Sequence, residues 1–407
     1  MNTIFRQAED PLRVPGGEQT CNMLSRIHQD ALRILEEVGV LCGSQEIQEL
    51  LADTGLAAYD DATGHIHVLT PLVDQALAAT PGRRDYWVPA NSFGVGGTAP
   101  FVFDDDSGEL VSPTLADIAS IAKIVDQAEP VNFMARGVLV PDREVEVMDT
   151  MIAHCQKPIY VGAVTEAGIR RAKQIHENRG NITVQFSIIN SPLNIMEGQI
   201  APFLSCVRQG IPIYLSTMPM AGLSAPYSMS GLLTLTHAEA LFGITLAQVV
   251  NPGCTVVHAG LPSIANIQKK YAVDMGLMAH TMANLLMDKI CEDLDLPSIQ
   301  SACGTNEERP GPQSEADAAA GYALLKKHGF HQMRHVFGFL KELVSFSLAK
   351  LERHIELCLE TGAEQAAEYV VEPYDEAGVE VIARNGSRPN YMRDDHTLHN
   401  LDHYFYK

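Results

Sequence analysis

Most of the residues that could do chemistry in this chain come directly after apolar runs, where the strands of a parallel sheet would end. They are amides, hydroxyls, thioethers, histidines and aromatics: Asn190, Ser191, Thr217, Met218, Met220, His258, Cys303, Thr305, Asn306, His335 and Phe337. A neutral lining of this kind suits a small organic ligand. It does not suit phosphate, which needs Lys, Arg or helix N-termini, and it lacks the paired carboxylates of a glycosidase.

Two groups of histidines have spacings that could gather metal ligands on one helical face. They are His328, His331 and His335 in HGFHQMRH, and His396, His399 and His403 in HTLHNLDH. No H-E-x-x-H motif accompanies them. Surface or core histidines are the simpler interpretation for all but His335 and His396, and we predict no metal site. A metal-dependent barrel enzyme that uses the first group remains an alternative.

One carboxylate stands alone in a long apolar stretch. Glu239 is the only charged residue between Arg208 and Lys269, and such a group must be paired or hydrogen-bonded. We interpret it first as a structural anchor. His258, in an apolar strand, is by default a core histidine, and the methionines of this stretch are better explained by core packing.

The same stretch indicates which elements position these residues. It reads as an apolar run at 211–218, a helix at 231–250 and a second apolar run at 255–259, with Pro and Gly between them. Strands that are apolar at successive positions are covered by helices on both faces. The breaks leave pieces shorter than the roughly 20 apolar residues of a membrane-spanning helix, so we predict a soluble core and no membrane contact.

Further apolar runs lie at 131–140, 158–164, 182–189, 297–302 and 333–340, and helical patterns separate them at 145–155, 166–178, 200–209, 271–293 and 314–327. No G-x-G-x-x-G follows any run, so the pattern predicts a (β/α)8 TIM barrel, an α/β fold, instead of a doubly wound sheet. The eighth strand is uncertain, and 379–382 or 391–392 could supply it.

The segments before the barrel read differently. Helical patterns at 21–38, 44–51 and 71–79 precede a Gly- and aromatic-rich segment, 86–110, which is typical of a β-hairpin or meander. We therefore predict an N-terminal helical and β-hairpin extension over residues 1–112 and the barrel over 113–407. The barrel is expected to be C-terminally short, either as a short chain or as a fragment.

Charge and cysteine content limit the partners and the compartment. A net charge of −21 argues against nucleic acid, because nothing offsets phosphate repulsion. The eight cysteines contain no C-x-x-C pair, and the N-terminus has no apolar signal segment. This pattern favours a reducing cytosol, and we predict a cytoplasmic protein. Helices with little charge also suggest a homo-oligomer.

Five segments together resemble the trimethylamine methyltransferase family. They are IHQDALRILEEVGV, SPLNI, the long segment from GIPIYLSTMPM to TLAQVVNPG, DLDLPSIQSACGTNE and YMRDDHTLHN. The resemblance implies a TIM barrel that transfers a methyl group from a methylated amine to the Co(I) corrinoid (cobalamin) of a separate protein. The founding members carry pyrrolysine, whereas this sequence has only standard residues. Members without pyrrolysine act on quaternary amines such as glycine betaine, and we expect that substrate class.

The expected substrate suggests which residues bind it. A quaternary ammonium has no N–H and is held by aromatic faces, for which Phe101, Phe103, Phe337 and Tyr391 are candidates. A substrate carboxylate could accept from Asn190, His258 or His335, and Met218 and Asn306 complete the predicted site. We assign no catalytic residue, and we expect no tightly bound cofactor. A quaternary-amine binding protein without catalysis is the non-enzyme alternative.

Overall fold

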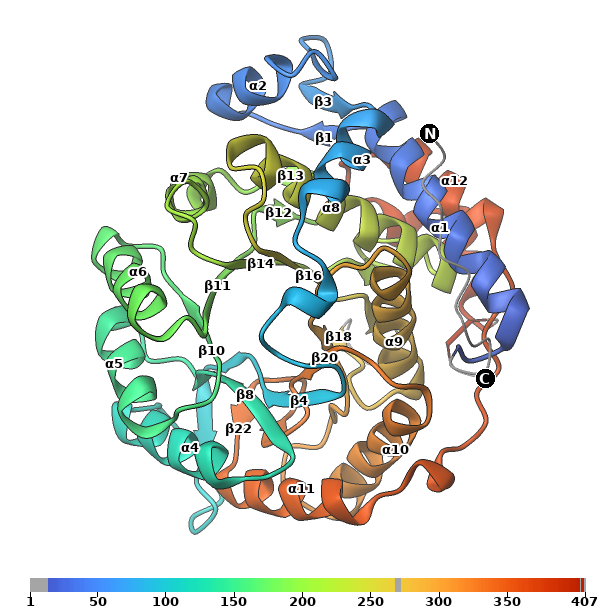
Figure 1. The fold of residues 1–407 in the computed structure, drawn as a ribbon. Coiled ribbons are helices and arrows are strands. Elements are labelled where there is room, and N and C mark those ends of the chain that lie inside the picture. The colour runs from blue at the N-terminus through green and yellow to red at the C-terminus, as the bar shows by residue number, and fades with distance from the viewer. Residues whose placement is uncertain (1–13, 268–271, 403, 406–407) are drawn as a thin grey trace.

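Eight parallel strands form a ring at the centre of the molecule (Figure 1). The computed structural model describes residues 14–267, 272–402 and 404–405. The hydrogen-bonded order is β16-β14-β11-β10-β8-β4-β20-β19, with every neighbouring pair parallel. A bridge between His258 and Ser298 closes the ring. The strands are β4 (Ser92–Val95), β8 (Val131–Ala135), β10 (Ile159–Gly162), β11 (Ile182–Phe186), β14 (Ile213–Thr217), β16 (Val256–Gly260), β19 (Gln300–Ser301) and β20 (Gln332–Arg334).

A helix follows each of these strands along the chain, and the helices surround the ring in Figure 1. They are α4 (Leu115–Gln127), α5 (Glu144–His154), α6 (Glu166–Arg179), α7 (Glu197–Arg208), α8 (Met229–Val250), α9 (Met278–Asp293), α10 (Pro312–His328) and α11 (Leu348–Glu360). Hydroxyl caps begin several of them; the Thr165 Oγ1 accepts from the Gly168 N–H at 3.0 Å. The alternation confirms the predicted (β/α)8 barrel.

One barrel strand comes from the predicted extension. β4 lies within 86–110, so the sheet takes a strand from before the predicted boundary at residue 113. The alternatives at 379–382 and 391–392 are wrong, because these residues lie in α12 (Glu376–Asn385) and in the 3-10 helix η4 (Tyr391–Arg393). β4 is four residues long, and a Cβ on its Gly94 would lie 2.2 Å from the Phe133 ring. A strand this short, with a glycine required for space, lacks an apolar run.

The remainder of that segment does form a hairpin. β6 (Phe101–Phe103) pairs antiparallel with β7 (Leu110–Val111), as predicted. Other short strands extend from the barrel loops or pair with the N-terminal part: β5 (Thr98–Ala99), β9 (Gly137–Val138), β12 (Ile189–Asn190), β13 (Asn194–Ile195), β15 (Met220–Ala221), β17 (Ser263–Asn266), β18 (Ala272–Val273), β21 (Phe339–Leu340) and β22 (Ser345–Phe346).

The N-terminal and C-terminal elements meet over α8, which contacts α1, α3 and α12 (Figure 1). The N-terminal elements are α1 (Gly17–Glu37), β1 (Val40–Leu41), α2 (Gln45–Ala52), β2 (Ala57–Asp60), β3 (His65–Val68), α3 (Thr70–Ala79) and η2 (Arg83–Asp85). After α11 come η3 (Ala363–Gln365), α12, η4 and α13 (Asp395–Asn400). The predicted helical segments before the barrel are confirmed, and α8 lies between the barrel and both chain ends.

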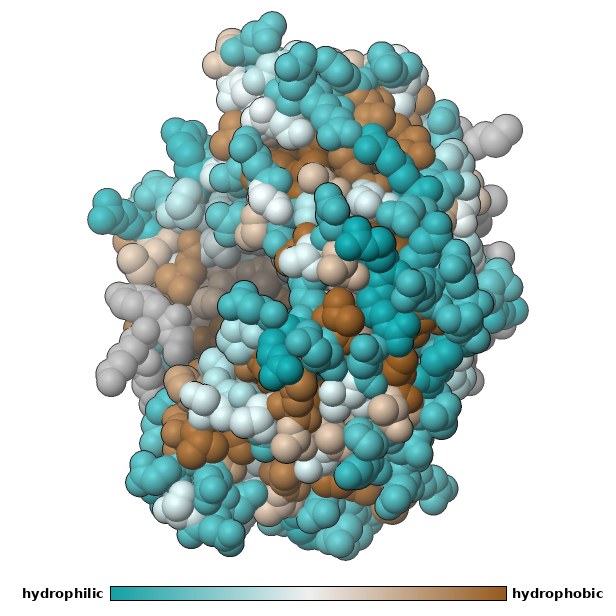
Figure 2. Space-filling view, turned by 90° about the vertical axis from the view of Figure 1, so that its left-hand side faces the viewer, coloured by the Kyte–Doolittle hydropathy of each residue, from teal (hydrophilic) through white to brown (hydrophobic). Residues whose placement is uncertain are grey.

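α8 is the one described helix long and apolar enough to cross a membrane. It has 22 residues, so the prediction that every apolar piece falls short of a span is wrong for this element. Yet 89% of its apolar window is buried inside the protein, which is the setting of a core helix. The surface seen from the side is mostly hydrophilic, with apolar residues in patches and in one shadowed hollow (Figure 2).

The barrel interior has its own small core, separate from the larger one between strands and helices. Its buried members are Tyr86, Val88, Phe133, Ala135, Tyr160, Tyr214, Val257, Ala259 and Ile299. Because side chains alternate along a strand, Val257 and Ala259 face inward while His258 faces the helices. The Tyr86 hydroxyl hydrogen-bonds the hydroxyls of Tyr160 at 2.9 Å and Thr183 at 2.8 Å, which closes the interior on the side where the chain enters β4.

Candidate active site

The carboxyl ends of the eight strands are where a (β/α)8 barrel places its active site. The structure brings some of the predicted residues to this end and leaves others in the core. The side chain of His258 faces outward from β16, where its Nε2 lies 3.2 Å from the Nδ1 of His237. His237 in turn contacts His28 at 2.9 Å. Burial lowers the pKa of His258 to about 4, so it is a neutral core histidine.

His335 lies at the end of β20. Its Nδ1 is 2.8 Å from the Ser301 hydroxyl at the end of β19. Its backbone has φ +67°, and a Cβ on Gly96 would lie 2.8 Å from its N atom, so the glycine after β4 makes room for it. Burial, together with the neighbouring Arg334, holds the pKa of His335 well below its ordinary value. The imidazole is therefore neutral at pH 7.

The other polar candidates differ in exposure. Asn306 is part of a loop network, since its Oδ1 accepts from the Met275 N–H at 2.9 Å and from the Gly276 N–H at 3.3 Å. Asn190 is exposed in β12, and Met218, just after β14, is 40% exposed. These three lie in loops after strands, as predicted; their contact with substrate stays a prediction.

The four aromatic candidates do not form one cage. Phe337 is fully buried and packs on Phe93 and Tyr322. Tyr391 is fully buried in η4, and its hydroxyl donates to the Gly386 carbonyl at 3.4 Å. Phe103 is 7% exposed and Phe101 39% exposed, both in β6. No ring contact joins any two of the four in the described part of the chain.

Glu239 is the anchor that its isolation predicts. Its carboxylate accepts from the Ser191 hydroxyl at 2.6 Å, from the Leu193 N–H at 2.9 Å and from the Thr217 hydroxyl. It thus ties the end of β14 to the loop after β12. Burial raises its pKa to about 7 despite these bonds, which favour the ionised form.

Two arginines at this end were absent from the predicted site. Arg136 directly follows β8, and Arg334 is the last residue of β20. The Arg334 Nη2 donates to the Ser216 hydroxyl and to the Ala259 carbonyl, both at 3.2 Å. Its guanidinium lies 5.3 Å from the centroid of the Tyr214 ring. The interpretation of the strand ends as a neutral lining is therefore wrong, and a charged residue inside the apolar runs 131–140 and 333–340 was the available signal.

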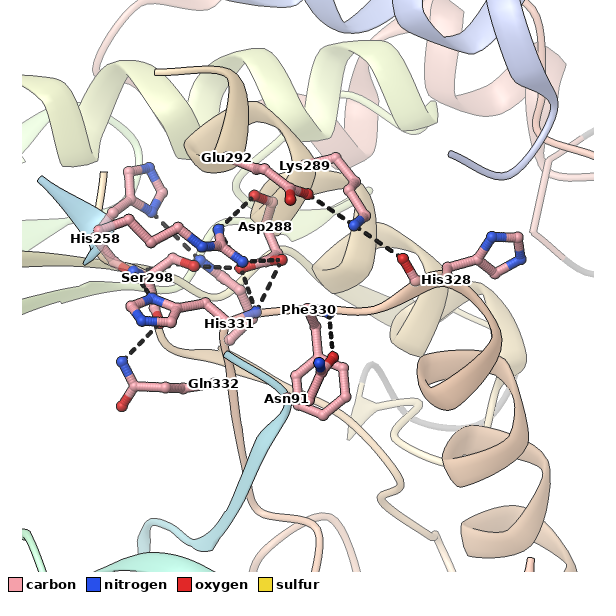
Figure 3. Close-up of polar contacts among 12 residues, drawn as sticks. Asn91, His258, Asp288, Lys289, Glu292, Ser298, His328, Phe330, His331 and Gln332 are labelled. Carbon is pink, nitrogen blue, oxygen red and sulfur yellow. Dashed lines mark hydrogen bonds and ion pairs between the residues drawn. The ribbon is translucent and has the colours of Figure 1, made fainter. Parts of the chain in front are cut away.

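The opposite end of the barrel holds a closed ionic network (Figure 3). Arg83 reaches Asp288 with both terminal nitrogens, at 3.2 and 3.1 Å. The same carboxylate accepts from the Ser298 hydroxyl and from the His331 N–H. Burial opposes ionisation, but Arg83 and Lys289 hold the pKa of Asp288 below its ordinary value. These partners bind the start of β20 to α9, so the network is structural.

The histidine groups do not gather around one point. His331 precedes β20, with its ring nitrogens bonded to the Ser298 N–H at 2.9 Å and the Val88 carbonyl at 3.1 Å, whereas His335 follows that strand. His396 pairs with Asp375 at 2.8 Å, and His403 lies outside the described residues. In the described ranges, no three His, Cys, Asp or Glu residues could hold a metal ion.

Comparison with known proteins gives relatives over nearly the full chain. A glycine betaine methyltransferase of Desulfitobacterium hafniense (strain Y51) is 23% identical, covering 95% of this chain and 85% of its own. A proline betaine:corrinoid methyltransferase of Eubacterium limosum is 23% identical, with coverages of 92% and 84%. The trimethylamine methyltransferase MttB of Methanosarcina barkeri (strain Fusaro / DSM 804) is 24% identical, with coverages of 82% and 72%.

Among solved structures, the monomethylamine methyltransferase MtmB of Methanosarcina barkeri is similar at a TM-score of 0.46 and 13% identity, covering 93% of this chain and 86% of its own. The family model described as trimethylamine methyltransferase (MTTB) matches residues 19–407. That match spans the N-terminal helices, the whole barrel and the C-terminal elements, and it shows that this chain belongs to the trimethylamine methyltransferase family.

Proposed function

We propose that this protein transfers a methyl group from a quaternary, glycine betaine-like amine to the Co(I) corrinoid of a partner protein. The observation that carries the proposal is the family match over residues 19–407. Two of the relatives bear names that include glycine betaine or proline betaine, and one of these names a corrinoid. The chain therefore belongs to a family of methyltransferases. We favour a quaternary amine as the substrate, because it loses a methyl group to leave a neutral tertiary amine.

The chemistry needs little from the protein beyond positioning. The bond between nitrogen and one methyl carbon breaks, its electron pair stays on nitrogen, and a neutral tertiary amine leaves. The partner's Co(I) corrinoid supplies the electron pair for the new carbon–cobalt bond, so charges and electrons balance without a further reactant. No proton has to move, because the leaving amine is already neutral. The barrel's task is to orient the amine and to exclude water.

Among the described groups at the strand ends, His335 is compatible with a cationic substrate. His335 is neutral, since its pKa lies well below its ordinary value, and its ring packs edge-on against Phe339 at 5.6 Å between centroids. A neutral imidazole carries no charge that would repel an ammonium group, and aromatic faces attract it. We retain Phe103 and the exposed Phe101 as proposed contacts of the ammonium end, and we reassign His335, predicted as a donor to the substrate carboxylate, to the same end.

The decisive experiment is anaerobic. The protein is mixed with Co(I) cobalamin and, in turn, glycine betaine, proline betaine, carnitine, choline or trimethylamine, and the loss of the Co(I) absorbance is followed. We expect conversion to methyl-Co(III) with a betaine and none with trimethylamine. Turnover of trimethylamine alone would contradict the proposed substrate class, and failure with every donor in the presence of the cognate corrinoid protein would contradict the transferase activity.

The proposal extends to partners and compartment. A corrinoid-binding protein is the required macromolecular partner, and we place both proteins in the cytoplasm, where the eight free cysteines stay reduced. We also propose a homo-oligomer, to be tested by light scattering. A protein that binds betaine without transferring methyl groups would show ligand binding in calorimetry and no change in the cobalamin spectrum.

A further inference from the structure

Two arginines converge on the barrel interior from strands on either side of β4. β8 and β20 are the neighbours of β4 in the sheet, and Arg136 and Arg334 stand at their carboxyl ends. Arg334 reaches across to Ser216 and to the Ala259 carbonyl, in β14 and β16. A Cβ on Gly162, at the end of β10, would lie 3.3 Å from the Arg136 Nη2. Both guanidinium groups therefore occupy the mouth of the barrel.

The glycines of neighbouring strands keep space for these groups. A Cβ on Gly96 would lie 2.5 Å from the Cβ of Arg334, and the missing Cβ of Gly162 leaves the site beside Arg136 open. Both arginines also act on Tyr214: burial raises the pKa of its hydroxyl, and the positive charges of Arg334 and Arg136 oppose that rise. The Tyr214 hydroxyl donates to the Gln185 Oε1 at 2.6 Å.

Neither arginine forms an ion pair with an acidic residue in the described part of the chain. Within residues 14–267, 272–402 and 404–405, no ion pair joins Arg136 or Arg334 to a carboxylate, and the buried Nε of Arg334 has no acceptor. The negative charge of Glu144 favours the charged form of Arg136, but its oxygens already accept from the N–H groups of Val164 at 2.9 Å and Thr165 at 3.1 Å. Burial accordingly lowers the pKa of both guanidinium groups.

A positive charge that is withdrawn from water without a counter-ion lowers the stability of the fold. A bound anion would supply the negative charge that the fold does not. Arg334 is 3% exposed, whereas Arg136 is half-buried, so a ligand meets Arg136 first, with Arg334 deeper. The fork of a guanidinium matches a carboxylate. A small anion is therefore the complement of this site.

We propose that Arg136 and Arg334 bind the carboxylate of the substrate, which makes the site specific for amino-acid betaines over quaternary amines without an acid group. This inference rests on the proposed function, and it replaces His258 as a carboxylate donor. With the carboxylate held inside the barrel, the N-methyl groups point toward the open mouth, where a partner's corrinoid must approach. The two arginines are thus specificity residues that also orient the substrate.

Binding can be tested without a corrinoid. Isothermal titration calorimetry on the full chain compares glycine betaine with choline, which keeps the ammonium and lacks the carboxylate. We expect glycine betaine to bind about ten- to a hundred-fold more tightly, the difference that a charged hydrogen-bonded pair supplies. Arg136→Gln should weaken glycine betaine binding by a similar factor and leave choline binding unchanged. The control is Arg143→Gln, at a half-exposed arginine paired with Glu146, which should change neither.

Two results would overturn the inference: equal affinities of the unmodified protein for both amines, or unchanged glycine betaine affinity in a folded Arg136→Gln variant. Arg334→Met is the second variant, and it should also weaken glycine betaine binding. If Arg334→Met does not fold, the result for Arg136→Gln is sufficient to test the inference. Selective binding without methyl transfer would support the carboxylate site and contradict the proposed activity. Methyl transfer from choline at the same rate as from glycine betaine would support the proposed activity and contradict the carboxylate site.

Discussion

At the N-terminal end of the barrel the guanidinium of Arg83 meets the carboxylate of Asp288, whereas at the C-terminal end Arg136 and Arg334 meet none in the described part of the chain. The side chain of Arg83 is 10% exposed, Arg334 is 3% exposed and Arg136 is half-buried. Arg83 is balanced within the fold by the Asp288 carboxylate, which also accepts from the Ser298 hydroxyl and the His331 N–H. Arg334 donates to neutral groups, the Ser216 hydroxyl and the Ala259 carbonyl. A balanced buried charge holds elements together, and an unbalanced one is available to a ligand.

Removing Asp288 should have the largest effect on the stability of the protein. Asp288→Ala leaves Arg83 buried without a counter-charge and frees the bonds to Ser298 and His331, so we expect the free energy of unfolding to fall by about 3–5 kcal/mol. Urea unfolding followed by circular dichroism measures it. Removing both partners, as Arg83→Met with Asp288→Leu, should cost less than Asp288→Ala alone. The control, Glu146→Ala in an exposed pair, should change stability by less than about 1 kcal/mol; a loss equal to that of Asp288→Ala would refute the distinction.

Glu239 is a buried acid at the C-terminal end of the barrel. Unlike Asp288, it is held by neutral groups. Its pKa rises from the ordinary 4.5 to about 7, so between these pH values the folded protein keeps a proton that the unfolded chain has released. Raising the pH through this window therefore lowers stability, by up to about 3 kcal/mol. Glu239→Gln should lose this slope, so the stability of the unmodified protein relative to the variant declines from pH 4.5 to 7 and then levels off. Parallel unfolding free energies across that range would contradict the raised pKa.

The barrel itself could be predicted because helices alternate with apolar runs in seven of its eight units. β4 could not, since the space beside Gly94, its third residue, is filled by the Phe133 ring, and a four-residue strand with a glycine has no apolar run. The residues predicted in its place, 379–382 and 391–392, belong to α12, which packs on α8, and to η4, which packs on α13.

The ends of the strands could be predicted in position but not in register. The strand ends were correctly identified, yet a shift of one residue exchanges the two faces of a strand. His258 faces the helices while Val257 and Ala259 face the interior, and Arg334, one residue before the predicted His335, reaches across the barrel. Only the hydrogen-bonded pairing of neighbouring strands fixes which residue of each pair points inward.

Substituting methionine for Arg83 and, separately, for Arg136 compares the contribution of each arginine to the free energy of unfolding. Arg83→Met strands Asp288 in the interior and should cost about as much as Asp288→Ala. Arg136→Met removes a charge that has no acidic partner, so the free energy of unfolding should change by less than about 1 kcal/mol, or rise. Thermal and urea unfolding of the two variants give the two values. A severe loss in Arg136→Met would mean that its guanidinium is part of the fold's own bonding, as that of Arg83 is.

The finest test changes the space beside Arg136 and leaves its charge in place. Gly162 has no positive φ that would exclude alanine, and the added Cβ would lie 3.3 Å from the Arg136 Nη2, so the guanidinium must shift by a few tenths of an ångström. We expect Gly162→Ala to leave the free energy of unfolding within about 0.5 kcal/mol and to weaken glycine betaine binding about two- to five-fold, with choline binding unchanged. Gly198→Ala, at a glycine whose added Cβ would meet nothing within 4 Å, is the matched control. Unaltered glycine betaine affinity in Gly162→Ala would place the carboxylate away from Arg136, whereas an equal loss for both amines would mean that the new methyl group blocks the mouth of the barrel instead of moving the arginine.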